Sequence, residues 1–170
     1  MLTNRRARDV AIIALFSLII FIEKAFIPPP YDKFFTILIE SLLLCLGFII
    51  VGFSGPIAIG LVSGLLASMR SGLAPFTITL ALLYGLLISI LSKVFRVKAD
   101  FNVNKGRLAI TAGIASIVVG LLGILITIMI GLPIPTIVIA LIFIVGLIQG
   151  IIGGYLAATI WIKILAKVKI

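Results

Sequence analysis

Long apolar runs separated by short polar segments dominate the sequence. Apolar runs of about 20 residues suit helices that cross a hydrocarbon core roughly 30 Å thick. The pattern therefore predicts an all-α membrane protein, folded as one bundle of six transmembrane helices in a single domain over residues 1–170. The expected spans cover residues 9–27, 34–51, 56–69, 75–91, 108–130 and 136–162.

Composition supports a membrane location. Hydrophobic residues make up 63% of the chain, and its mean hydropathy is +1.44. A soluble domain of this length has too little interior to bury so much apolar surface. The net charge of +9 would suit a nucleic-acid-binding protein. However, the basic residues lie in short segments between apolar runs, where membrane topology explains them, so we expect no nucleic-acid partner.

Topology follows from the distribution of the basic residues. With six spans and a cytoplasmic N-terminus, eleven of the fourteen Lys and Arg residues lie at cytoplasmic ends. The third span would rise only about 21 Å, which makes a re-entrant segment an alternative. With a re-entrant third segment, only four of the fourteen Lys and Arg residues would lie on the cytoplasmic side. We therefore expect six full spans, with both termini cytoplasmic, in the plasma membrane. The basic start resembles a signal peptide, but no cleavage site follows, so the first span should be retained.

The small-residue stretch of residues 52–70 is expected to lie at the centre of the bundle. The pair Gly55-Pro56 should break the chain before the third helix, because proline disfavours helix on its N-terminal side. Small residues spaced four apart share one helix face and let a neighbouring helix approach closely. One such face contains Gly60, Gly64 and Ser68, and a second, in the last span, contains Gly146, Gly150 and Gly154.

The sequence lacks the residue sets of most membrane enzymes. It has no histidine, a single cysteine at Cys45, and five acidic residues, of which only Glu40 lies well inside a span. One carboxylate cannot provide paired acid–base chemistry, and no metal-ligand or nucleotide-binding motif is present. The sequence therefore predicts binding, transport or scaffolding, with no enzymatic activity, no metal and no cofactor.

The sequence contains the segment Ala7-Arg8-Asp9-Val10-Ala11 and, further on, the Gly-Pro-led run of residues 55–64. These segments resemble the S components of energy-coupling factor (ECF) transporters, small membrane proteins that capture vitamins or their precursors. The resemblance extends over nearly the whole chain in order, length and topology. It implies partners: a transmembrane coupling subunit and two ATPase subunits. Ala7 and Ala11, with Ala14 on the same face, would then form the smooth surface that docks on the coupling subunit.

The resemblance also implies a substrate site in the outer half of the bundle, among spans 4 to 6 and beneath the loop after span 1. Its residues are chosen here by their chemistry. Glu40 is the first candidate, because a carboxylate inside a membrane needs a partner, and a cationic ring or amine would supply one. Lys33 or Arg70 would supply that partner within the chain. The further candidates are Arg70, Thr77, Thr79, Tyr84, Gln149 and Tyr31.

Most of the further candidates also have a structural explanation. Arg70 would anchor a helix end at the interface, and Tyr31 would sit in the interfacial aromatic belt rather than stack on a ligand. Thr77 and Thr79 would each bond the carbonyl four residues earlier. Gln149 would bridge two helices instead of contacting substrate.

Two other functions remain open at this level. The first is a structural or assembly protein without a ligand, in which Glu40 and Arg70 form a clasp. The second is a small carrier or channel that works as a homo-oligomer, although the two halves of the sequence show no convincing repeat.

Overall fold

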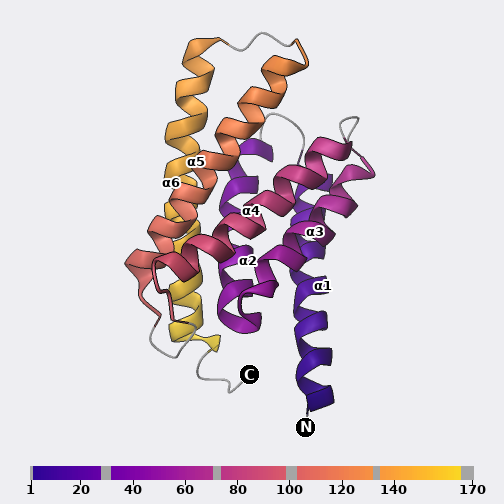
Figure 1. Ribbon diagram of the computed structural model, residues 1–170, viewed down its shortest axis with the longest axis vertical. Helices are drawn as coiled ribbons and strands as arrows, with labels where there is room; N and C mark the ends of the chain where they lie inside the picture. The colour runs from indigo at the N-terminus through magenta and orange to yellow at the C-terminus, as the bar shows by residue number, and fades with distance from the viewer. Residues whose placement is uncertain (1, 28–31, 71–73, 99–102, 132–134, 166–170) are drawn as a thin grey trace.

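The computed structural model describes residues 2–27, 32–70, 74–98, 103–131 and 135–165, which form six α-helices (Figure 1). The six predicted helices are confirmed, although the first begins well before residue 9. In chain order they are α1 (Leu2–Phe26), α2 (Asp32–Val51), α3 (Ser54–Ser68), α4 (Ala74–Val94), α5 (Lys105–Met129) and α6 (Thr136–Lys163).

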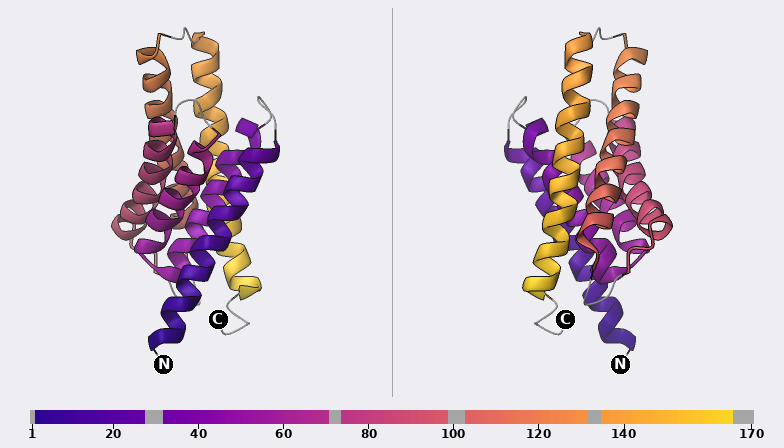
Figure 2. Two further views of the ribbon diagram at one scale, coloured as in Figure 1. Left: turned by 90° about the vertical axis from the view of Figure 1, so that its right-hand side faces the viewer. Right: turned by 90° about the vertical axis from the view of Figure 1, so that its left-hand side faces the viewer.

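Successive helices run in opposite directions, so α1 begins at the same end of the bundle at which α6 finishes (Figures 1 and 2). We call this the terminal end, and the end where α1 finishes and α2 begins the distal end. Helices α5 and α6 extend beyond the other four at the distal end (Figures 1 and 2).

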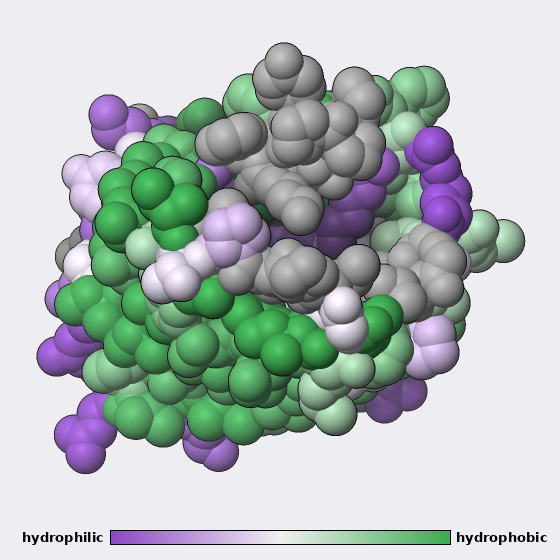
Figure 3. Space-filling view, turned by 90° about the horizontal axis from the view of Figure 1, so that it is seen from above, coloured by the Kyte–Doolittle hydropathy of each residue, from purple (hydrophilic) through white to green (hydrophobic). Residues whose placement is uncertain are grey.

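Within the described residues, three helical segments are long and apolar enough to cross a membrane: Ala74–Val94, Lys105–Met129 and Ile139–Lys163. Two further apolar segments, Phe35–Val51 and Ser54–Ser68, are shorter. Many large apolar side chains lie on the outside of the bundle, as a lipid environment requires. Seen from the distal end, the surface is mostly hydrophobic, with a hydrophilic hollow near the middle (Figure 3).

Helix α2, rather than α3, occupies the centre of the bundle. It contacts all five other helices, whereas α3 contacts α1, α2 and α4. Nearly every residue from 40 to 49 is buried, and the side chain of Cys45 is fully enclosed. The expectation that the bundle is built around residues 52–70 is therefore wrong. Helix α3 is too short to contact every neighbour, and its small residues pack against two of them: Gly55 against Gly47 of α2, and Gly60 and Gly64 against α4.

The close approach predicted for Gly60 and Gly64 is confirmed, and it is made with α4. A Cβ atom added at Gly60 would collide with the carbonyl oxygen of Ala81, and one at Gly64 would lie 3.0 Å from the Ala81 Cβ. In the other direction, a Cβ at Gly85 of α4 would collide with the carbonyl of Pro56. The hydroxyl of Ser68, the third predicted member of this face, donates to the Leu65 carbonyl of its own helix at 2.7 Å.

The turn before α3 lies earlier than predicted. The chain reverses at Gly52, whose φ of +93° is accessible to glycine and strained for other residues. The helix then starts at Ser54, so Gly55 and Pro56 lie in its first turn. Proline is tolerated there because the first amides of a helix have no intrahelical acceptor.

The predicted glycine face of α6 is confirmed at two of its three positions. A Cβ at Gly150 would lie 2.7 Å from the Ala112 carbonyl oxygen, and one at Gly154 would lie 2.7 Å from the Leu108 carbonyl oxygen. Both contacts bring α6 against α5. Gly146 makes only an ordinary contact, 3.7 Å from the side chain of Ile37 in α2.

We predict that Gly85→Ala lowers the stability of the protein, because the added methyl group must push α4 away from the α3 backbone. Overpacking of this kind costs about 1–3 kcal/mol, or roughly 2–4 °C in melting temperature for each kcal/mol in a chain of this size. Thermal unfolding in detergent measures the change.

The matched control is Gly123→Ala on α5, where the new Cβ would lie 4.0 Å from its nearest neighbour, Leu80. Because alanine favours helix over glycine, this variant should be neutral or more stable. Equal melting temperatures for the two variants would contradict the close α3–α4 contact.

Candidate functional site

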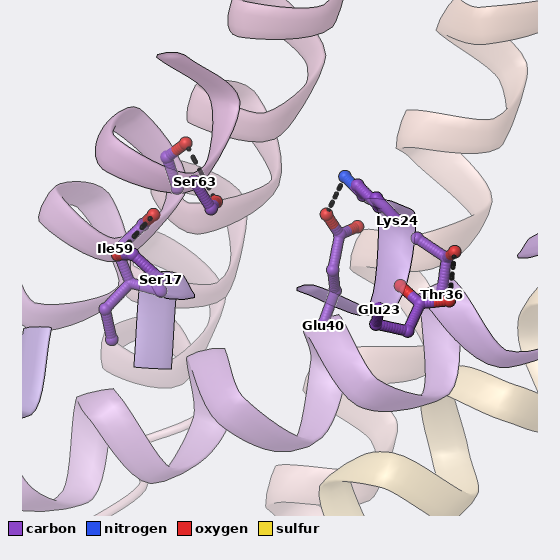
Figure 4. A network of polar contacts seen from close by, with 8 residues as sticks. Ser17, Glu23, Lys24, Thr36, Glu40, Ile59 and Ser63 are labelled. Atoms are coloured by element: carbon purple, nitrogen blue, oxygen red, sulfur yellow. Dashed lines mark hydrogen bonds and ion pairs between the residues drawn. The ribbon is translucent and has the colours of Figure 1, made fainter. Parts of the chain in front are cut away.

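Charged side chains from α1 and α2 meet near the distal end of the bundle. Lys24, in the last turn of α1, forms an ion pair with Glu40 of α2 (Figure 4). The lysine side chain is 23% exposed and the glutamate side chain only 11%. Because so little water reaches the Glu40 carboxylate, the Lys24 ammonium group is what stabilises its negative charge inside the bundle.

A second polar contact lies beside the first. The Thr36 hydroxyl of α2 donates to Oε1 of Glu23 in α1 at 2.8 Å, and Glu23 is buried (Figure 4). Glu23 and Lys24 are consecutive in α1, while Thr36 and Glu40 are one turn apart on the same face of α2. Where the two antiparallel helices cross, two consecutive polar residues of α1 therefore pair with two polar residues of α2.

Arg70 does not pair with Glu40, which corrects the clasp considered from the sequence. Its guanidinium donates to the backbone carbonyl of Ala25, in the last turn of α1. The last carbonyls of a helix lack intrahelical donors, and a basic side chain that supplies one stabilises that helix end. Arg70 is exposed, and this position agrees with an anchoring role at a helix end.

A cavity of about 230 Å³ adjoins the Lys24–Glu40 pair. The two charged residues line it together with Thr77, and its apolar wall comes from Leu80, Ala81 and Val119. Four helices contribute to it: α1, α2, α4 and α5. Figure 3 shows hydrophilic surface in a hollow at this end of the molecule. A cation, a carboxylate and a hydroxyl on an apolar wall form the usual pattern of a small-molecule site, in which a few polar groups fix orientation.

The cavity is smaller than the roughly 300–1,000 Å³ typical of sites for drug-sized ligands. It has room for a small polar molecule or for one ring of a larger one. A charged ligand would replace one member of the Lys24–Glu40 pair: a cation would pair with Glu40 in place of Lys24, and an anion with Lys24 in place of Glu40.

The other predicted hydrogen-bonding residues of α4 have different environments. Thr79 is exposed, and its hydroxyl donates to the Pro75 carbonyl at 2.8 Å, as its structural explanation predicts. Tyr84 is buried, with its hydroxyl 2.7 Å from Ser116 Oγ of α5. Since the Ser116 hydroxyl already donates to the Ala112 carbonyl at 2.8 Å, Tyr84 acts as the donor. This bond ties α4 to α5.

The remaining predicted residues lie elsewhere. Gln149 is half-buried on α6 and does not line the cavity. Tyr31 falls outside the described residues. Ala7, Ala11 and Ala14 are all exposed on α1, on a face that no described helix covers.

Sequence reasoning missed Lys24, Glu23 and Thr36 as members of this site. The charged residues after the first apolar run were visible, but which of them faces Glu40 depends on how α1 crosses α2. The one available signal was the i, i+4 spacing of Thr36 and Glu40, which places both on one face of α2. Among the described residues, no three His, Cys, Asp or Glu side chains gather closely enough to hold a metal ion.

Comparison with protein families, with curated proteins and with solved structures finds no match to this chain. Its function is therefore inferred from its own residues.

We predict a measurable coupling energy between Lys24 and Glu40. Lys24→Gln or Glu40→Gln alone leaves one charge unpaired inside the bundle and should cost about 3 kcal/mol. The double variant should cost less than the sum of the two single variants, because it removes both charges. Thermal unfolding of the four proteins in detergent completes this double-mutant cycle.

The control cycle uses Arg8→Gln and Asp9→Asn. That pair lies 3.1 Å apart near the start of α1, with side chains 33% and 24% exposed. Because water screens it more, its coupling should lie within about 0–1 kcal/mol. A Lys24–Glu40 coupling no larger than this control would refute the view that Lys24 neutralises a buried charge.

Proposed function

We propose that this protein is the membrane-embedded substrate-capture subunit of an ECF-type importer for a vitamin or vitamin precursor. In this proposal all six helices lie in the plasma membrane, both termini are cytoplasmic, and the distal end faces outward. The protein binds its substrate without altering it chemically. Transport is driven by two ATPase subunits through a transmembrane coupling subunit.

The distal cavity is the observation that carries this proposal. It joins Lys24, Glu40 and Thr77 on an otherwise apolar wall, near the end of the bundle away from the termini. The proposed six-span topology puts eleven of the fourteen basic residues on the cytoplasmic side of the membrane. In that topology the distal end lies on the outer side. A polar cavity reached from outside is what a capture protein needs, and an ion pair that a ligand can open offers a charged group to the substrate.

The exposed alanine face of α1 supports the same proposal. Ala7, Ala11 and Ala14 face away from α2 and α3, the two described helices that α1 contacts. Alanine adds little bulk, so another membrane helix can approach and slide along this face. A surface of this kind suits a subunit that docks on a partner and reorients against it.

A structural role is the second candidate, and the Lys24–Glu40 pair is the observation that favours it. The two charges neutralise each other within the fold, so neither requires a ligand. Under this alternative the pair clasps α1 to α2 and the cavity stays without a specific occupant.

A ligand screen separates the two candidates. We expect one vitamin or precursor in a broad panel to raise the melting temperature of the detergent-purified protein. At 100 times the dissociation constant, a ligand adds about 2.7 kcal/mol of stability, which is several degrees here. Native mass spectrometry of the gently purified protein then identifies what it retains.

A cavity-filling variant locates the binding site. Val119→Phe should abolish the ligand-induced shift, because the larger ring occupies the cavity. Leu121→Phe, on the exposed side of the same helix, should leave the shift unchanged. If no compound shifts the melting temperature and the mass is that of the protein alone, the structural role holds.

The docking assignment gives a separate prediction. Ala7→Trp combined with Ala11→Trp should preserve the ligand-induced thermal shift but lower substrate uptake by whole cells at least tenfold. The control, Ile144→Trp with Ile148→Trp, places two tryptophans with the same four-residue spacing on an exposed face of α6. Uptake retained by the α1 variant, or lost equally in the control, would reject docking through this alanine face.

A further inference from the structure

A second and larger hollow, of about 440 Å³, lies at the terminal end of the bundle. It is formed where α2 ends, the chain turns into α3, and α4 ends. Phe48, Gly52, Phe53 and Val97 form its apolar part. Three cationic residues complete the lining: Lys93, Arg96 and Lys98. The distal cavity shares none of these residues.

The three cations have no acidic partner in the part of the chain that the structure describes. Both described ion pairs lie elsewhere, in α1 and between α1 and α2. Lys93 instead places its ammonium group 5.8 Å from the centre of the Phe53 ring. All three residues are exposed. The hollow therefore combines an apolar floor with an uncompensated positive rim.

Arg96 occupies a backbone position that does not suit it. Its φ is +51°, the only positive value among the described residues other than glycine. The amides of Arg96 and Val97 bond back to the carbonyls of Lys93 and Ser92, at 3.1 and 2.8 Å. These two bonds form the Schellman motif that ends many helices, in which the left-handed position is usually glycine. An arginine at this position lowers the stability of the backbone, but it places a cationic side chain at the hollow.

Arg107, at the start of α5, explains why this helix end needs no further cation. Its guanidinium approaches the carbonyls of Phe95 and Arg96, at 3.4 and 3.5 Å. The exposed carbonyls at the end of α4 thus have a basic partner already. Lys93, Arg96 and Lys98 remain available for an anion from outside the protein.

From this geometry we propose that the hollow binds the phosphate headgroup of an anionic phospholipid in the cytoplasmic leaflet. Arginine matches phosphate oxygens with two parallel hydrogen bonds, and the lysines add point charges. The apolar floor would receive the part of the lipid next to the phosphate. Basic pockets at the cytoplasmic ends of membrane helices are suited to such headgroups, because that leaflet carries the anionic lipids.

This site requires that the chain lie in a membrane with its terminal end at the cytoplasm, but it does not depend on substrate capture. A soluble phosphate compound offers the same chemistry. The lipid is favoured because the hollow is open and lies at the end of the bundle that carries Arg5, Arg6 and Arg8 of α1 and Lys163 of α6.

The test compares phosphatidylglycerol and phosphatidylcholine with identical acyl chains, added to the full-length protein in neutral detergent. Phosphatidylglycerol should raise the melting temperature, and native mass spectrometry should show it retained. Phosphatidylcholine should do neither to the same extent. Lys93→Gln and Lys98→Gln should each weaken phosphatidylglycerol binding about fivefold, since each removes one charge near the lipid phosphate.

Arg96 provides a sharper measurement because its two effects have opposite signs. Arg96→Gly, or Arg96→Asn if glycine loosens the turn, should raise the melting temperature in detergent alone by relieving the strained backbone. The same variant should lose most of the phosphatidylglycerol-induced shift. A purely structural arginine would show neither the gain nor the loss. Arg5→Gln and Arg6→Gln, at the start of α1, remove equal charge outside the hollow and should retain the shift.

Three results would overturn the proposal. The two lipids could give equal shifts, which would show that the hollow does not select the anionic headgroup. Alternatively, Arg5→Gln could reduce the shift as much as Lys98→Gln, which would show a general charge effect. Inorganic phosphate at millimolar concentration could reproduce the full shift, which would assign the hollow to a soluble phosphate compound. None of these results bears on the ligand screen at the distal cavity, so the two proposals fail separately.

Discussion

Helix α2 is enclosed by the other five helices, and this enclosure sets the conditions for the rest of the molecule. Between residues 40 and 49 this helix meets little water or lipid, so each polar group there must find a partner inside the bundle. Glu40 is the costliest of these groups to bury because it carries a charge, and Lys24 of α1 pairs with it. Thr36, on the same face, bonds Glu23 of the same neighbour. The central position of α2 thereby fixes where α1 must cross it.

The outer helices around α2 pack closely in pairs. Helix α3 lies so close to α4 that backbone touches backbone at Gly60 and Gly85, and α6 approaches α5 in the same way at Gly150 and Gly154. In a membrane, lipid tails are as apolar as leucine, so association depends on such close contacts rather than on the exclusion of water. The distal cavity lies where α4 and α5, one helix from each pair, face α1 and α2.

The six helices and their close-packing faces could be predicted because both signals are local. Run length indicated each helix, and the four-residue spacing of small residues indicated which face would be approached. The central helix could not be predicted, because a face buried in protein and a face turned to lipid are equally apolar in sequence. For the same reason the partner of Glu40 was missed, since it depends on the crossing of two helices. Of the proposed site residues, Glu40 and Thr77 line the distal cavity, whereas Tyr84 bonds a neighbouring helix and Thr79 its own.

The burial of Cys45 gives this protein an internal reporter of its own integrity. It is the single cysteine of the chain, and its side chain is fully enclosed in the middle of α2. A maleimide dye reaches such a thiol only when the helices separate, so the labelling rate measures how often the bundle opens. Every detergent, lipid or compound of interest can be ranked in this way on the natural sequence, without an engineered tag.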